Sequence, residues 1–206
     1  MTRFFDWFQL AVLICLICLG FGKGLILRNR GIRVIVVDLP SSGTQAVADL
    51  LFLISAVLWF YETLAYALPL DFHVVPTSLS PVIVNNLAFK VAGMVLSVLG
   101  LVIYGLALRR MGESWRIGID KEKAEGLVTD GLFAWTRNPI YVALDLLAFS
   151  AFLIVGRLVL LVLVLVIAAS FHRQIRKEER FLVQTYGDAY RDYCSRVGRY
   201  CKLPQF

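Results

Sequence analysis

Three long apolar stretches restrict what this sequence can fold into more than any other feature. They cover Phe8–Leu27, Ala46–Leu68 and Val82–Leu108. A helix needs about 20 apolar residues to cross the roughly 30 Å hydrocarbon core of a bilayer, and each stretch provides them. The chain is also 59% hydrophobic and only 17% charged, whereas soluble domains have about 45–50% apolar and about 25% charged residues. This composition excludes an ordinary soluble domain and a disordered chain.

Two shorter apolar stretches, Ile140–Val155 and Leu158–Phe171, complete the pattern. Because only Gly156 and Arg157 separate them, we expect a tight antiparallel helical hairpin. The sequence therefore predicts an all-α integral membrane protein with about five transmembrane helices. We expect a single membrane domain over residues 1–206, with three N-terminal helices within residues 1–110 and a second half at residues 111–206.

The basic residues indicate how the helices are oriented. Eighteen of the 21 Lys and Arg residues fall in segments 23–45, 109–138 and 172–206, which share one side of the membrane if there are five crossings. By the positive-inside rule this side is the cytoplasm, and the loop Pro69–Pro81, which has no Lys or Arg, lies on the other face. We therefore expect a protein of the inner (cytoplasmic) membrane, surrounded by membrane lipids. The net charge of +6 reflects this topology and predicts no nucleic-acid partner.

The start of the fourth apolar helix carries polar residues that helix formation explains only in part. Asn138 suits the N-cap position and Pro139 the first helical position. Arg137, Tyr141 and Asp145 follow at a spacing of four, which places a cation, a phenol and a carboxylate on one helix face. A carboxylate inside a membrane is costly and marks a functional candidate. The alternative is structural, with Asp145 paired to Arg137 or to a lysine of a neighbouring helix.

A charged run leaves the membrane after the last apolar stretch, from His172 to Arg180. Such a run often forms a collar toward the lipid headgroups, but the adjacent Glu178 and Glu179 point about 100° apart on a helix. One of them is therefore expected to face a binding site while the other meets solvent or Arg176. The hairpin returns this run to the membrane face where the fourth helix begins, and we expect one cytoplasmic-side site there.

The C-terminal tail is expected to be a cytoplasmic helix from about His172 to Tyr193, with a break at Tyr186-Gly187-Asp188. It carries eight of the basic residues in 172–206 and so lies with the other cytoplasmic segments. Its tyrosines are expected to act as amphipathic anchors at the level of the headgroups: Tyr186, Tyr190, Tyr193 and Tyr200.

Two segments of the second half resemble the integral-membrane isoprenylcysteine carboxyl methyltransferases and their prokaryotic relatives. The first is Leu127-Val-Thr-Asp-Gly-Leu-Phe-Ala-Trp-Thr-Arg-Asn-Pro-Ile-Tyr141, and the second joins Glu178-Glu179-x-x-Leu182 to Tyr186-Gly187-x-x-Tyr190-x-x-Tyr193. The resemblance extends over about Met111–Pro204. It implies a helical membrane fold that holds S-adenosyl-L-methionine at the cytoplasmic ends of the last two helices and the tail. It also implies a lipophilic methyl acceptor that enters from the lipid.

The resemblance also assigns roles to individual residues. It implies that Arg137 and Glu178 are catalytic, the first orienting an acceptor carboxylate and the second lying at the reacting centre. The residues that it places around the cofactor are Leu127, Val128, Gly131, Asn138, Tyr141, His172 and Glu179. The residues expected to bind the acceptor are Trp115, Arg116 and Asp145, although a tryptophan at this place also suits an interfacial anchor. No metal is expected, because methyl transfer from a sulfonium needs none and the chain offers no Cys/His ligand set.

At one position the chain departs from the family, which usually has Arg-His-Pro where this sequence has Arg137-Asn138-Pro139. An amide still forms hydrogen bonds but does not titrate, so the acid/base role of a histidine is absent here. Ala143 also stands where a glycine is common in the family.

Two other functions stay open at this level. Membrane reductases of the sterol-reductase type share an Arg-x-Pro-x-Tyr helix start and a Tyr-Gly tail, and they use NADPH, for which this short-looped chain offers little room. A non-catalytic membrane scaffold is the second alternative. We favour a membrane methyltransferase that uses S-adenosyl-L-methionine.

Overall fold

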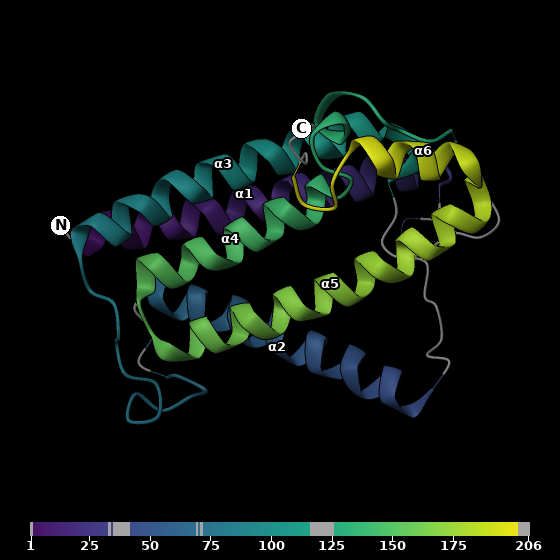
Figure 1. Ribbon diagram of the computed structural model, residues 1–206. Helices are drawn as coiled ribbons and strands as arrows, with labels where there is room; N and C mark the ends of the chain where they lie inside the picture. The colour runs from purple at the N-terminus through teal and green to yellow at the C-terminus, as the bar shows by residue number, and fades with distance from the viewer. Residues whose placement is uncertain are drawn as a thin grey trace.

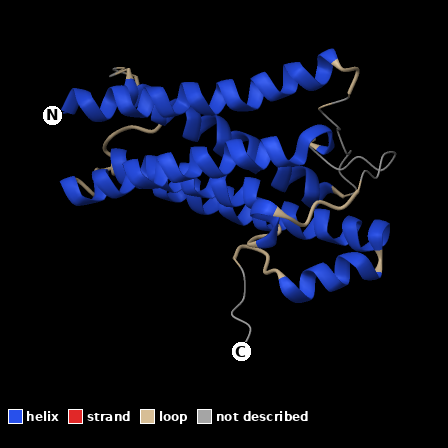
Figure 2. Ribbon diagram, turned by 90° about the horizontal axis from the view of Figure 1, so that it is seen from above, coloured by secondary structure: helices blue, strands red, loops and turns tan. Residues whose placement is uncertain are grey.

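The computed structural model describes residues 2–32, 34, 42–68, 70, 72–115 and 126–201. Over these residues all regular secondary structure is helical and no strand is present (Figure 1; Figure 2). In chain order the helices are α1 (Thr2–Asn29), α2 (Gly43–Ala67), α3 (Leu87–Met111), η1 (Gly112–Ser114), η2 (Gly131–Ala134), α4 (Pro139–Val155), α5 (Leu158–Tyr186) and α6 (Asp188–Arg196). The prediction of an all-α fold is confirmed.

Four of these helices, α1, α2, α3 and α5, are long and apolar enough to cross a membrane. Large apolar side chains such as Trp7, Phe21, Leu50 and Val57 are exposed on α1 and α2, as expected for helices that face lipid. The chain is therefore an integral membrane protein. α4 is apolar but has only 17 residues, so the count of five crossings stays a prediction.

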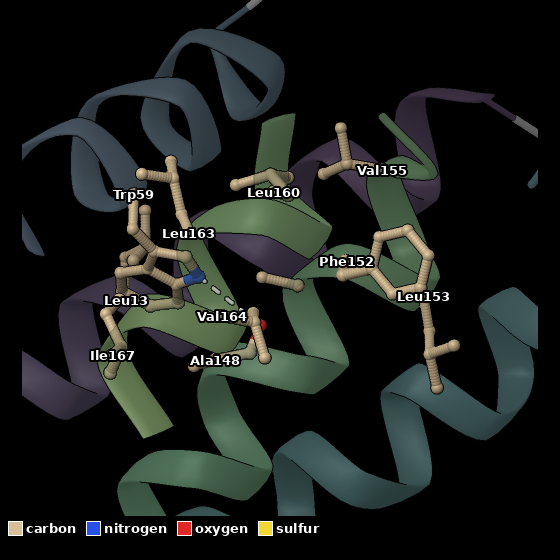
Figure 3. Close-up of a cluster of buried hydrophobic side chains, with 11 residues drawn as sticks. Leu13, Trp59, Ala148, Phe152, Leu153, Val155, Leu160, Leu163, Val164 and Ile167 are labelled. Carbon is tan, nitrogen blue, oxygen red and sulfur yellow. Dashed lines mark hydrogen bonds between the residues drawn. The ribbon is translucent and has the colours of Figure 1, made fainter. Parts of the chain in front are cut away.

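The largest hydrophobic cluster joins α1, α2, α4 and α5 (Figure 3). Leu13 of α1 and Trp59 of α2 meet Ala148 and Phe152 of α4 in this cluster, together with Leu163 of α5. The Trp59 indole N–H donates a hydrogen bond of 3.3 Å to the Ala148 carbonyl, also drawn in Figure 3. This bond satisfies a polar group that has no water partner inside the bundle.

α3 and α4 approach each other closely because small residues line their contact. A Cβ atom on Gly93 of α3 would lie 2.8 Å from Ile154 Cγ1 and 2.9 Å from the Ser150 carbonyl oxygen, both on α4. Between the two helices the Ser97 hydroxyl donates a hydrogen bond of 2.8 Å to Ser150. Close backbone approach of this kind is typical of helix pairs in membranes and fixes the position of α4.

Replacing Gly93 by alanine is expected to destabilise the fold by about 1–3 kcal/mol, because the added methyl group forces α3 and α4 apart. Gly22→Ala in α1 is the control, since a Cβ atom there has no neighbour within 4 Å. The free energy of unfolding of both variants in detergent, relative to the unsubstituted protein, tests this expectation. Equal values for the two variants would contradict a tight crossing at Gly93.

The third apolar stretch becomes helical later than the sequence indicates. We expected a helix from Val82, but α3 begins at Leu87, after Asn86, whose side chain caps its first turn. The segment before it instead pairs with the turn between α4 and α5, where Ile83 N–H donates to the Gly156 carbonyl at 2.8 Å. The helical expectation for residues 82–86 is wrong because this backbone finds its partners across the molecule.

The predicted hairpin of α4 and α5 is present, and its turn requires a glycine. Gly156 has a φ of 77°, in the region that glycine adopts without a steric penalty. A Cβ atom there would also lie 1.7 Å from the Val84 carbonyl oxygen. No larger residue fits this position without moving the backbone.

A buried polar network closes this end of the molecule, and nothing in the sequence indicated it. Arg157 is 7% exposed and Glu62 of α2 is 1% exposed, and they form an ion pair with Nη1 and Oε2 2.6 Å apart. Arg157 also donates to His73 Nδ1 at 2.8 Å and to the Val75 carbonyl at 2.9 Å. Its Nε donates to the Ser80 carbonyl at 3.3 Å. The network ties α2, the following loop and the hairpin turn together.

α4 and α5 lie side by side near this turn and separate toward the opposite end (Figure 1). There α5 ends at Tyr186, and Gly187, with a φ of 54°, redirects the chain into α6. The predicted break at 186–188 is confirmed. α6 runs back toward the start of α4 (Figure 1), so the start of α4, the end of α5 and α6 gather at one end of the molecule.

Candidate active site

Tyr141 of α4 and Glu178 of α5 meet at this end. The Tyr141 hydroxyl donates to Glu178 Oε1 at 2.5 Å, and Gln174 Nε2, one turn earlier on α5, donates to the same oxygen at 3.0 Å. The rings of Tyr141 and Phe171 meet edge to face with their centroids 5.2 Å apart. The predicted convergence of the two polar segments is confirmed by these contacts. Both hydrogen-bond donors to Glu178 are neutral, so neither cancels the charge of its carboxylate.

Glu179 is engaged differently from what its sequence position suggests. We expected the second glutamate to meet solvent or Arg176, but Glu179 is only 8% exposed. Its Oε1 lies 3.0 Å from Arg137 Nη2, and its Oε2 accepts hydrogen bonds of 3.0 and 2.6 Å from Arg199. These bonds also raise the pKa of the Arg199 guanidinium. That expectation was therefore wrong: Glu179 lies between two arginines, which together carry one positive charge more than it balances.

Residues 197–201, which we call the strap, connect the start of α4 to α5. On the α4 side, Arg137 N–H donates to the Gly198 carbonyl at 3.1 Å, and the Thr136 hydroxyl donates to the Arg199 carbonyl at 3.1 Å. On the α5 side, the Arg199 side chain binds Glu179 as described. The strap therefore holds the two site-bearing helices in register although it follows α6 in the chain.

Asn138 contributes to the strap rather than to its own helix. It occupies the position before α4, with Pro139 first in the helix, as expected. However, its side chain makes no capping hydrogen bond and instead donates from Nδ2 to the Arg199 carbonyl at 3.1 Å. The predicted side-chain cap is wrong, because the strap carbonyl takes the amide. The same geometry also places Arg137 before the first turn of α4, so only Tyr141 and Asp145 of the predicted polar face lie on the helix.

Replacing Asn138 by alanine is expected to loosen the strap, because one of its side-chain anchors to the α4 start is lost. A single hydrogen bond of this kind contributes about 1 kcal/mol, so amide hydrogen exchange of residues 197–201 should quicken by about fivefold. Asn86→Ala, which removes the cap of α3 at the other end of the molecule, is the control. Unchanged exchange in the strap would show that Asn138 does not hold it.

The tail tyrosines form a buried cluster. Tyr190 and Tyr193 are 1% and 3% exposed and pack with Val197, Leu127 and other side chains of α5 and α6. The Tyr193 hydroxyl donates to the Phe133 carbonyl at 2.6 Å, and burial raises the pKa of Tyr193 to about 12, so the hydroxyl keeps its proton. The expectation of headgroup anchors is wrong for Tyr190 and Tyr193, whose rings bury α6 against the rest of the tail.

His172 and Tyr200 form a second polar pair near α5. His172 Nδ1 and the Tyr200 hydroxyl are 2.6 Å apart, and their rings stack with centroids 6.0 Å apart. Burial, followed by the nearby carboxylate of Asp145, raises the pKa of the Tyr200 hydroxyl.

Three buried polar atoms at this end have no hydrogen-bond partner among the described residues. They are Arg137 Nε, a donor, and two acceptors, Asp145 Oδ1 and Glu179 Oε1, of which the second lies 3.0 Å from Arg137 Nη2 in an ion pair. The structural alternative for Asp145, a pair with Arg137, is wrong, because the guanidinium of Arg137 is turned to Glu179. Buried donors and acceptors without partners are rare in native proteins. Arg137 and Asp145 lie four residues before and four residues after Tyr141 in the sequence.

The structure places the remaining predicted site residues as follows. Trp115 is 6% exposed and lies in a cluster with Leu27, Tyr104, Leu108 and Ala143. This burial contradicts an interfacial anchor in contact with headgroups, and binding of an acceptor there stays a prediction. Arg116 lies outside the described residues. Leu127 borders the tyrosine cluster, Val128 is half-buried, and Gly131, with a φ of 61°, begins η2.

Several site residues were not found from the sequence. Arg199 and Gln174 looked like ordinary charged and polar tail residues, and only the return of α6 shows what they contact. Arg110 of α3 pairs with Asp130, with Nε and Oδ1 2.7 Å apart, and so ties the loop before η2 to α3. Among the described residues no group of His, Cys, Asp and Glu side chains could hold a metal ion.

Comparison with known families agrees with this arrangement. Residues 89–189, which include α4 and nearly all of α5, match the sequence model of the phospholipid methyltransferase family. The matched segment makes up just under half of the 206-residue chain. The matched residues include both the Tyr141 helix start and the paired glutamates. The resemblance to the isoprenylcysteine carboxyl methyltransferases is confirmed by individual relatives.

Two curated relatives are protein-S-isoprenylcysteine O-methyltransferases from yeasts. The chain is 33% identical over 109 residues to the one from Schizosaccharomyces pombe, covering 49% of this chain and 46% of the relative. It is 29% identical over 111 residues to the one from Saccharomyces cerevisiae, covering 52% of this chain and 46% of that relative. The chain thus spans about half the length of the curated relatives that it matches.

A solved structure shares the fold. It is the eukaryotic intramembrane Ras methyltransferase, an isoprenylcysteine carboxyl methyltransferase, and its alignment has a TM-score of 0.52 at 24% sequence identity. The alignment covers 81% of this chain and 54% of the solved one. At this identity the likeness shows that the fold is shared.

Proposed function

We propose that this protein transfers a methyl group from S-adenosyl-L-methionine to a lipophilic acceptor that reaches the site from the membrane. The contact between Tyr141 and Glu178 carries the proposal, because it joins the two segments of the methyltransferase match at one end of the bundle. The names of the two yeast relatives support the reaction type, and the four membrane-spanning helices support a membrane-delivered acceptor.

The charges at the site suit this cofactor, which carries a sulfonium and an ammonium cation as well as a carboxylate. Glu178, whose hydrogen-bond donors are neutral, offers negative charge to a cation. The two arginines around Glu179 leave an excess positive charge at this end, and the buried Nε of Arg137 is a free donor for the anionic group of the acceptor. Residues 127–131 and His172 lie around the same end, where an adenosine would be held.

Individual residues then act by positioning. Bound S-adenosyl-L-methionine supplies a methyl group already activated for in-line displacement. Arg137 holds the anionic group of the acceptor, and Glu178, fixed by Tyr141 and Gln174, provides negative charge at the reacting centre. The part of the site that holds the cofactor is formed by Tyr141, Asn138 and Glu179. Asn138 and Glu179 also hold the strap in place. Holding the two reactants in near-attack geometry lowers the barrier without any proton transfer.

The distribution of Lys and Arg supports a site on the cytoplasmic side, where the cofactor is made. We further propose that residues 1–206 form one membrane domain. In it, residues 1–110 supply three helices as a frame, and residues 111–206 form the catalytic half. The inner membrane is the location that the positive-inside pattern favours.

Calorimetry on the detergent-solubilised protein tests the proposed function. S-adenosyl-L-homocysteine, the product form of the cofactor, is expected to bind with a micromolar dissociation constant, and NADPH is expected not to bind. Binding of NADPH alone would favour a reductase. Binding of neither would favour a membrane scaffold. Incubating native membranes with a methyl-labelled donor then identifies the acceptor by its label.

A further inference from the structure

The basic residues that follow the apolar part of α5 lie on one face of this helix. Their spacing of three and four residues is that of a single helix face: Arg173, Arg176, Lys177 and Arg180. The other side of the same turns carries Glu178 and Glu179, which contact Tyr141 and Arg137 at the start of α4. The basic face is therefore turned away from the candidate active site.

This basic face continues an exposed apolar stripe of the same helix. Val162 and Leu165 are 50% and 62% exposed, and Ala169, one turn later, is exposed as well. Apolar side chains exposed on a membrane-spanning helix face lipid. With the arginines they form one series in steps of three or four residues: Val162, Leu165, Ala169, Arg173, Arg176 and Arg180. One side of α5 thus changes from apolar to cationic as the helix leaves the membrane.

The length of the apolar part of this stripe matches one leaflet of a bilayer. From Val162 to Arg173 the helix rises by about 16 Å, and half of the hydrocarbon core is about 15 Å. An acyl chain along Val162 and Leu165 therefore ends in a headgroup near Arg173. Helical side chains lean toward the N-terminus of their helix, which for α5 is the membrane side. Arg176 and Arg180, though further along the helix, therefore reach back toward the headgroups.

Arg176 and Arg180 are the cations of this stripe that the chain leaves uncompensated. The Arg173 side chain donates to Asp49 of α2 at 2.6 Å. Arg176 and Arg180 are exposed, and no acidic side chain in the described part of the chain pairs with either. Guanidinium groups bind phosphate through two parallel hydrogen bonds. Clusters of basic residues directly beyond a membrane-spanning helix are typical of sites for anionic lipids.

We propose that this stripe of α5 binds an anionic phospholipid. The phosphate of its headgroup lies on Arg176 and Arg180, and an acyl chain lies along Val162, Leu165 and Ala169; we call these five residues the lipid face. A zwitterionic phospholipid has the same phosphate, but its own cation weakens the attraction to the arginines. Because Glu178 is on the other side of α5, the bound lipid is distinct from the cofactor and from the methyl acceptor. The inference does not rest on the proposed function.

Two photoreactive phospholipids with the same diazirine-bearing acyl chain test the lipid face. A phosphatidylglycerol probe or a phosphatidylcholine probe is added to phosphatidylcholine nanodiscs that hold the protein, and the labelled peptides are mapped. Each basic side chain near an anionic headgroup gives about a fivefold preference. The phosphatidylglycerol probe is therefore expected to label the apolar part of α5 at least about tenfold more than the phosphatidylcholine probe.

Arg176→Gln together with Arg180→Gln is expected to remove this preference by lowering labelling with the phosphatidylglycerol probe alone. Arg28→Gln together with Arg109→Gln is the matched control. It removes the same charge from exposed residues in the last turns of α1 and α3, and it should leave labelling of α5 unchanged. The melting temperatures of both double variants in phosphatidylcholine nanodiscs should equal that of the unsubstituted protein, which shows that the fold is intact.

Equal labelling of α5 by the two probes in the unsubstituted protein would overturn the inference, whatever the variants do. Equal losses in the two double variants would also contradict it, because they would show a general effect of surface charge. Inorganic phosphate at about 10 mM, compared with chloride at the same ionic strength, separates a lipid from a soluble anion. It should not lower labelling, and displacement of the probe by phosphate would mean that the arginines bind a soluble anion instead.

The lipid face and the proposed function fail separately. None of these measurements involves the cofactor or methyl transfer. If S-adenosyl-L-homocysteine does not bind, the proposed function is wrong while the labelling of α5 still stands. If the probes label α5 equally, the lipid face is wrong while binding of S-adenosyl-L-homocysteine is unaffected.

Discussion

Glu178→Gln is expected to lower the rate of methyl transfer by about 10²–10³-fold, the usual effect of removing one preorganised electrostatic group from a reacting centre. Glutamine keeps the shape of the side chain and an oxygen that accepts from Tyr141 and Gln174, so the contact between α4 and α5 persists. What is lost is the negative charge that, in the proposed function, faces the sulfonium of the cofactor. Initial rates with a labelled methyl donor, measured in nanodiscs, test this.

The control for this variant is Glu113→Gln, which removes a glutamate with a 52% exposed side chain from a surface ion pair with Arg30. Its rate should stay within about twofold, because exposed ion pairs contribute little. The melting temperature of Glu178→Gln should match that of the unsubstituted protein. A rate that is unaffected in Glu178→Gln would remove Glu178 from the reacting centre, and a loss of folding would make it a structural residue.

Arg157→Met is expected to produce the largest loss of stability, about 3–5 kcal/mol, because it leaves the carboxylate of Glu62 buried without its counterion. Glu62 is 1% exposed, so water does not replace the guanidinium. The carbonyls of Val75 and Ser80 lose their donors as well. The free energy of unfolding in mixed micelles measures the effect.

A double variant separates the ion pair from the packing around it. Glu62→Leu together with Arg157→Met removes both charges, and it should recover a large part of the stability lost in Arg157→Met alone. Arg191→Met, which breaks an exposed pair with Asp188, should cost less than about 0.5 kcal/mol. If the double variant is no more stable than the single one, the buried charge of Glu62 is not the cause.

The helical frame followed from the sequence because length and hydropathy suffice to define it. The ends of α1 and α2 lie within a few residues of the expected ones, except that α1 begins near the N-terminus, at Thr2. The start of α3 was misplaced because hydropathy does not distinguish an apolar helix from an apolar extended segment. Only the pairing of Ile83 with Gly156 decides between them.

The site followed from the sequence only where the hairpin of α4 and α5 by itself brings residues together. The neighbourhood of Tyr141 and Glu178 was predictable, since the hairpin must return α5 to the start of α4. The partners of Glu179 were not, because Arg199 reaches it after the chain has turned at Gly187 and run back through α6. Nor was the Glu62–Arg157 pair, whose members are far apart in sequence and lie in segments that looked uniformly apolar or loop-like.

The buried network around Glu62 and Arg157, which we call the clamp, holds the hairpin turn at the membrane face opposite the site. The positions that control stability are therefore separate from the positions that perform chemistry. α4 has 17 residues, a length of about 25 Å. Tilting this helix by about 5° about the Gly156 end displaces Tyr141 by about 2 Å, whereas productive alignment tolerates about 0.5 Å. Conservative changes at the remote clamp should therefore slow turnover in protein that remains folded, and a mutational scan confined to the reacting side would miss them.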